Sequence, residues 1–190
     1  MQSQDLFLVA GLAIPDDELL FDQEASRELP QLVRRALFLP APDRQRLRDC
    51  ARSLAEVPET LSQGNRSLYG QYPPGLGSLL VQMLALRNLG WSSAAKVMYL
   101  MSGVYLSAAT IGALGRGVKE IDAELLDGLS VVLGVPVATL ARLTGVRPAV
   151  EIRRHSSGTV DTAALLWDVR HLTAEQVREV SRLADALGQE

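Results

Sequence analysis

The centre of the chain reads LGWSSAAKVMYLMSGVYLSAATIGALGRG from Leu89 to Gly117, and this stretch decides the fold. Within it, the run from Val97 to Gly115 carries no charge and is nearly as long as the ~20 residues of a membrane helix. Gly103 and Ser107 interrupt the run, and glycine is a common helix end while serine is a common N-cap. The sequence therefore predicts two short helices joined by a turn, in a soluble protein, rather than a membrane span.

The composition of the whole chain favours an all-α fold. Of its 190 residues 47% are hydrophobic but only 5% are aromatic, so Ala, Leu and Val supply the apolar surface. This is typical of small-residue helices and argues against a sandwich or barrel. The single Cys50 excludes an intramolecular disulfide, and one Cys with two His is too few for a closed zinc site. We therefore expect no metal, no cofactor and, without a secretory signal, a cytoplasmic protein.

Breaks in the helical pattern divide the chain into four parts. Glycine and proline concentrate in the second part, and the densest helix start and stop signals lie in the third. The predicted parts are an N-terminal helical segment 1–61, a linker 62–77, a central domain 78–145 and a C-terminal helical pair 146–190.

The N-terminal segment contains a row of arginines. Pro30 is expected in the first turn of one helix, and Asp43 is expected to cap the next. In that second helix Arg44, Arg48 and Arg52 recur at i, i+4 and i+8, so they share one face. This arginine row could contact phosphates, but acidic residues accompany it, and a solvated surface is the favoured interpretation.

Five short helices are predicted in the central domain. Ser107 and Asp122 stand where N-caps are expected, and Gly103 and Gly134 stand at predicted helix ends. Apolar residues flank both caps in the spacing of a hydrophobic staple. The expected helices run over about 78–88, from 92 or 93 to 102, over 108–115, over 123–133 and over 137–143.

The C-terminal pair is predicted to follow an irregular arm over 146–159. Asp161 or Thr162 is expected to cap its first helix, which carries Trp167, and Thr173 to Gln176 form a capping box at the start of the second. Two small amphipathic helices cannot bury their apolar faces alone, so they need either the rest of the chain or a second copy. We expect a homodimer through these helices, with Trp167 in the core of a monomer as the competing interpretation.

Residues 84–92, 106–111, 114–117 and 125–140 of the central domain carry the caps and turns of five short helices, with a tight turn between the second and the third. In these residues the domain, which covers about a third of the chain, resembles the lambda-repressor-like helix-turn-helix of the Xre family. The resemblance implies a DNA-binding transcriptional regulator whose third helix lies in the major groove of double-stranded DNA. The DNA contacts that it implies are Ser93, Ser107, Ala108, Ala109, Thr110, Ala113, Arg116 and Lys119.

The predicted third helix is unusual in presenting alanines where bases are read. Alanine offers only a methyl contact, whereas discrimination between bases usually comes from Arg, Asn or Gln. Phosphate contacts from a few cations would give weak, salt-sensitive binding. The alternative is therefore a protein-interaction module of the same fold, because small uncharged faces suit close protein packing. The cations available in this domain are Arg87, Lys96, Arg116, Lys119 and Arg142.

Two groups of residues resemble catalytic motifs but lack other residues that those motifs require. Gly112 and Gly117 have the spacing of a phosphate-binding loop, but Val118 replaces the required lysine. His155, Ser156 and Asp161 are the residue types of a hydrolase triad, but no nucleophile elbow accompanies them. We therefore do not expect an enzyme.

Overall fold

The computed structural model describes residues 1–55, 72–149 and 156–189, and every regular element in these ranges is a helix. The all-α prediction is thus confirmed. Parts of the predicted N-terminal segment (56–61), of the linker (62–71) and of the arm (150–155) lie outside the described residues. The helices are α1 (Ser3–Val9), η1 (Asp16–Leu19), α2 (Gln23–Ala36), α3 (Ala41–Ala55), α4 (Leu76–Ala85), α5 (Trp91–Ser102), α6 (Ala108–Gly115), α7 (Ala123–Leu133), α8 (Val137–Thr144), α9 (Ser157–Asp168) and α10 (Ala174–Leu187).

Most helix ends follow the predicted caps. The Ser107 and Asp122 side chains accept hydrogen bonds from the first turns of α6 and α7, and the Thr173 capping box begins α10. Gly103 and Gly134 end their helices with φ of 77° and 63°, values that favour glycine. The uncharged run is therefore divided as predicted. In the described ranges, no helix combines the length and apolarity needed to cross a bilayer.

Three predicted helix starts are wrong. Asp43 does not cap α3 but lies in its first turn, because the Pro40 carbonyl oxygen already accepts the backbone N–H groups of Asp43 and Arg44. Asp22 caps α2, so Pro30 lies inside that helix and not in its first turn. The reason is that Ala25 and Leu29 already belong to the buried stripe, so packing stabilises the turns before the proline. Ser156, not Asp161 or Thr162, caps α9, and helix therefore replaces the last part of the expected arm.

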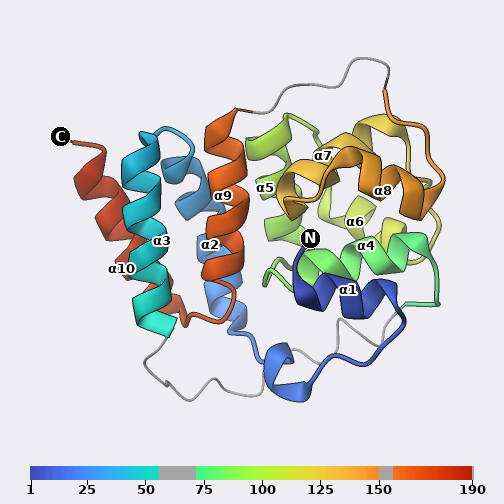
Figure 1. Cartoon of the computed structure of the whole chain (residues 1–190), viewed down its shortest axis with the longest axis horizontal. Coiled ribbons are helices and arrows are strands. Elements are labelled where there is room, and N and C mark those ends of the chain that lie inside the picture. Colours follow the sequence, from blue (N-terminus) through green and yellow to red (C-terminus); the bar gives the residue numbers. More distant parts are fainter. Residues whose placement is uncertain (56–71, 150–155, 190) are drawn as a thin grey trace.

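The helices form two neighbouring groups (Figure 1). In one group, the N-terminal helices α2 and α3 pack against the C-terminal helices α10 and α9. The other group contains α4 to α8, with α1 packed on α4. α5 also packs on α2 and so joins the groups. Segments far apart in the sequence thus pack against one another, and the C-terminus lies at the outer edge of the view while the N-terminus lies near its middle, at the start of α1 (Figure 1).

The arginine row of α3 pairs with carboxylates, and only its last member, Arg52, is exposed to solvent as predicted. Arg44 pairs with Asp161, at 2.9 Å between Nη2 and Oδ2, and Arg48 pairs with Asp168, at 2.7 Å between Nε and Oδ2. Arg52 reaches the same Asp168 at 3.3 Å. Both aspartates lie on α9, so the row joins two helices across the fold.

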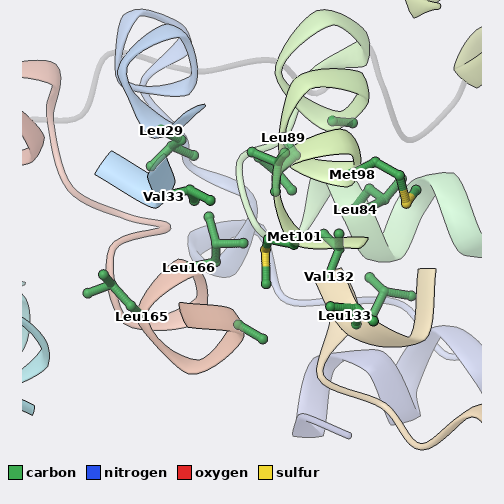
Figure 2. Close-up of a cluster of buried hydrophobic side chains, with 14 of the residues drawn as sticks. Leu29, Val33, Leu84, Leu89, Met98, Met101, Val132, Leu133, Leu165 and Leu166 are labelled. Atoms are coloured by element: carbon green, nitrogen blue, oxygen red, sulfur yellow. The ribbon is translucent and has the colours of Figure 1, made fainter. Parts of the chain in front are cut away.

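A single hydrophobic core runs through both groups. Leu29 and Val33 from α2, Met101 from α5, Val132 from α7 and Leu166 from α9 point into one cluster (Figure 2). All five are buried. Because the core is continuous, the C-terminal helices are part of the same packed body as the central helices.

A buried ion pair ties α1 to this body. Arg87, just after α4, has no exposed surface and bonds both carboxylate oxygens of Asp5 at 2.9 Å. Its guanidinium also donates to the carbonyl oxygens of Met83 and Leu133, at 2.7 and 2.6 Å. The cation lies 5.1 Å from the ring centroid of Trp167. Four helices, α1, α4, α7 and α9, therefore meet around one charged group.

Candidate nucleic-acid interface

α6 is held against the fold by its glycine face. A Cβ atom at Gly112 would lie 3.2 Å from the Trp91 ring, and one at Gly115 would lie 2.6 Å from the Tyr72 ring. Trp91 Nε1 donates to the Tyr72 hydroxyl at 2.7 Å, which fixes the two rings relative to each other. The opposite side of α6 consequently remains outermost.

The start of α4 approaches α6 closely as well. A Cβ at Gly77 would overlap the carbonyl oxygen of Leu114. Glycine at these contacts allows helix backbones to come together. Packing therefore accounts for Gly77, Gly112 and Gly115, and the phosphate-loop spacing noted in the sequence needs no phosphate.

The N-terminus of α6 is open to solvent. Ser107 is exposed, and its Oγ accepts the backbone N–H of Thr110 at 3.1 Å and lies 2.9 Å from the Thr110 hydroxyl. Ala109 is exposed, while Ala108 and Ala113 are half-buried. The structure thus brings together all the residues predicted on this helix, on a surface made of methyl and hydroxyl groups.

The two predicted cations lie just beyond the end of α6. Arg116 is exposed, and its guanidinium reaches back over Gly112. Lys119 Nζ lies 2.8 Å from Asp122 Oδ2, in an ion pair that solvent reaches. The hydrogen bond from Lys119, with that from the backbone N–H of Leu125, holds the pKa of Asp122 below its ordinary value. Arg116 therefore has the more available charge.

Ser93 does not belong to this surface, so the DNA contact predicted at this residue is wrong. The residue is only 6% exposed, and its hydroxyl lies 2.8 Å from that of Ser26 on α2. It also donates to the Gly90 carbonyl oxygen at 3.1 Å. Ser93 shares a helical face with the buried Val97, four residues on, a spacing that could have revealed its burial. Arg87 is likewise buried and cannot contact phosphate.

Sequence reasoning missed two exposed tyrosines beside the start of α6. Tyr99 on α5 and Tyr105 in the connection 103–107 are 56% and 83% exposed. Their rings meet edge to face, with centroids 6.2 Å apart. The available signal was the position of Tyr99, which lies three residues after the exposed Lys96 and so on the same face of α5.

The electrostatic character of this surface differs from that of the chain as a whole. The chain has a net charge of −3, yet between Gly90 and Lys119 the only charged residues are Lys96, Arg116 and Lys119. α5, the connection and α6 therefore carry no carboxylate, and Lys96 and Arg116 are exposed there, while Asp122 pairs with Lys119 just beyond α6. Such a surface attracts polyanions.

The apolar faces that suggested a dimer seam are covered within the chain. Leu166 on α9 and Val177 and Val180 on α10 are buried against the N-terminal helices and the core. Trp167 is half-buried, with Arg87 on one side and Arg170 at 3.9 Å from its ring centroid. The structure thus explains these residues without a second copy.

The residue types that resembled a hydrolase triad have other contacts. Ser156 caps α9, and Asp161 pairs with Arg44, while His155 lies outside the described residues. In the part of the chain that the structure describes, no group of His, Cys, Asp and Glu is arranged to hold a metal ion.

Comparison of the chain with models of protein families, with curated proteins and with solved structures finds no match. The functional proposal therefore depends on the surface around α6 and on the sequence resemblance.

Proposed function

We propose that the protein is a DNA-binding transcriptional regulator of the lambda-repressor-like, Xre helix-turn-helix type. In this proposal α4 to α8 are the five helices of the domain, and α6 enters the major groove of double-stranded DNA. The observation that carries the proposal is the exposed, capped N-terminus of α6, with no carboxylate on α5, on α6 or on the connection between them. The resemblance in sequence supports the same assignment.

The contacts follow from the chemistry of the surface. Ala109 can touch a thymine methyl group, and the absence of long side chains lets the backbone of α6 approach the bases. The hydroxyls of Ser107 and Thr110 and the cation of Arg116 are suited to phosphate oxygens. Because few cations take part, the affinity is modest and strongly dependent on salt.

The test is a fluorescence titration of labelled duplex DNA, carried out at two salt concentrations. One duplex is the region upstream of the protein's own coding sequence, and the other has a scrambled sequence. The Arg116→Ala/Lys119→Ala variant should bind more weakly, and the slope of log affinity against log salt should fall by about 1 for each phosphate that the variant leaves unneutralised. Arg34→Ala, on the exposed side of α2, is the matched control and should bind as the parent does. Unchanged binding by the double variant would contradict the docking mode.

We include a homodimer in the proposal, because one copy offers few cations to DNA. Its seam would avoid the buried apolar faces of α9 and α10. Light scattering should give twice the 20.6 kDa chain mass. A monomer at the concentrations used for the DNA titration would remove this part of the proposal.

The second candidate is a helix-turn-helix-fold module that binds a protein instead of DNA. The exposed Tyr99 and Tyr105, with Val118 at 74% exposure, favour it, because large exposed side chains are typical of protein interfaces. No affinity for either duplex, together with a defined complex that Tyr105→Ala abolishes, would favour this candidate. DNA binding without a stable protein complex would exclude it.

A further inference from the structure

The paired tyrosines next to α6 have no function in the DNA contacts proposed above. Two tyrosines whose rings touch while the residues remain 56% and 83% exposed form an unusual surface feature. The edge-to-face contact favours the rotamers in which the two rings meet. A partner that used them would lose little side-chain entropy.

The tyrosines continue a row of hydrogen-bond donors along α5. Ser92, Lys96 and Tyr99 are spaced i, i+4 and i+7, and all three are exposed, so they follow one outer face of the helix. Tyr105 extends the row beyond the end of α5, through its contact with Tyr99. Each of these side chains ends in a group that can donate a hydrogen bond.

The chemistry of the row selects one occupant. It contains two phenol groups, one aliphatic hydroxyl and one ammonium group, with no carboxylate on α5, on the connection or on α6. A partner that presents a line of anionic acceptors satisfies all of them, and the phosphate backbone of a nucleic-acid strand is such a line. An apolar protein partner would leave the ammonium of Lys96 and the hydroxyls without acceptors.

We propose that Ser92, Lys96, Tyr99 and Tyr105 form a phosphate-contact row, which binds the sugar-phosphate backbone of the DNA strand beside the groove that α6 enters. This inference rests on the proposed function and adds the residues that hold the strand. Because the row contacts no base, it contributes affinity that is independent of sequence. It thereby compensates for the weak base recognition by an alanine-lined helix.

The test uses the same duplex titrations on the full chain, with variants that separate hydroxyl, ring and charge. Tyr99→Phe/Tyr105→Phe removes only the hydroxyls and should weaken binding to both duplexes by about tenfold or more. The salt slope should not change in this variant, because the hydroxyls are neutral. Lys96→Ala should lower the slope by about 1. Urea unfolding of each variant checks that the fold is intact.

Phe38→Ala is the matched control for removal of an exposed aromatic ring. Phe38 is 84% exposed, in the connection between α2 and α3, and its variant should bind DNA as the parent does. If the double Phe variant binds as tightly as the parent while Arg116→Ala/Lys119→Ala binds weakly, the row is wrong and the proposed function stands. If Tyr99→Ala/Tyr105→Ala weakens binding and the double Phe variant does not, the rings act by packing, which also overturns the row. If the parent itself binds neither duplex, the proposed function fails.

Discussion

The arginines of α3 and the cations around α6 differ in whether acidic residues far away in the sequence pair with them. In α3 the row Arg44, Arg48 and Arg52 looks like a basic surface, but aspartates more than a hundred residues away on α9 neutralise it. Around α6 the cations are fewer, yet Arg116 and Lys96 remain exposed, with no acidic neighbour in their own helices. The available charge of a surface therefore depends on tertiary partners more than on the number of basic residues.

The buried charge at Arg87 is the extreme case of this contrast, and removing its partner should have the largest effect. Asp5→Ala leaves the guanidinium buried without its carboxylate, so the free energy of unfolding should fall by about 3–5 kcal/mol. Urea unfolding followed by circular dichroism measures the change. Asp49→Ala, at an exposed aspartate of α3, should stay within about 0.5 kcal/mol of the parent.

A second variant tests the reason for that destabilisation. In Asp5→Ala/Arg87→Met no buried charge is left, so the double variant should be more stable than Asp5→Ala alone. Equal or lower stability would show that α1 is held by packing and not by the ion pair.

Arg44 and Arg116 should give opposite results in two assays. Arg44→Ala removes a buried cation that bonds Asp161 and the Leu39 carbonyl oxygen, so stability should fall by about 2–3 kcal/mol. Arg116→Ala should keep the free energy of unfolding within about 0.5 kcal/mol of the parent value but weaken binding to duplex DNA. Weaker DNA binding by a folded Arg44→Ala variant would remove the distinction between the two regions.

The glycines of the two regions should also respond differently to an added methyl group. Gly115→Ala places a Cβ against the Tyr72 ring at 2.6 Å. The free energy of unfolding should therefore fall by about 1–2 kcal/mol, because the contact becomes overpacked. Gly158 lies in α9, where the nearest atom would be 3.4 Å away, an ordinary contact. Gly158→Ala should therefore be neutral or slightly stabilising, since alanine favours helix. Thermal unfolding of both variants decides whether the close approach of α6 requires glycine.

The smallest effect is expected at the junction of η1 with the end of α9. Burial and the nearby Arg170 lower the pKa of His171, whose ring stacks on Phe21. Burial raises the pKa of Glu18, but the hydrogen bond and charge of Arg170, with the smaller contribution of His171, together outweigh burial and leave the pKa below its ordinary value. Both depressed values mean that the unfolded chain binds more protons, so stability should be lost as pH falls below about 6.5, and further below about 4.5.

Comparison with His171→Gln isolates the histidine, because glutamine does not titrate. The urea midpoint of the parent should fall more steeply from pH 7 to pH 5 than that of the variant. Parallel pH profiles would show that His171 contributes nothing to the acid sensitivity.

Local signals in the sequence predicted most helix ends. Ser107, Asp122 and the Thr173 capping box act through neighbours within a few residues, so their geometry is encoded locally. The start of α2 was missed because burial outweighs the cost of Pro30 inside a helix, and burial depends on distant partners. The pairing of α3 with α9 could not be predicted for the same reason, because it depends on residues that are distant in the sequence.

The candidate surface could be predicted only in part. The residues of α6 lie together because one helix carries them all, and Arg116 follows directly. The family resemblance implied Ser93 as a DNA contact, but α2 covers it through Ser26. Tyr99 and Tyr105 were overlooked, since nothing in the sequence showed that two tyrosines around a helix end would meet in solvent.

The pairing of α2 and α3 with α9 and α10 also bears on synthesis of the chain. The helices at 23–55 emerge from the ribosome well before the helices at 157–187 that cover their apolar stripes. Until then residues such as Leu29, Val33 and Leu47 have no lasting cover, and long-range closure is slow compared with helix formation. The nascent chain therefore passes through a stage with exposed apolar surface, in which binding by chaperones competes with aggregation.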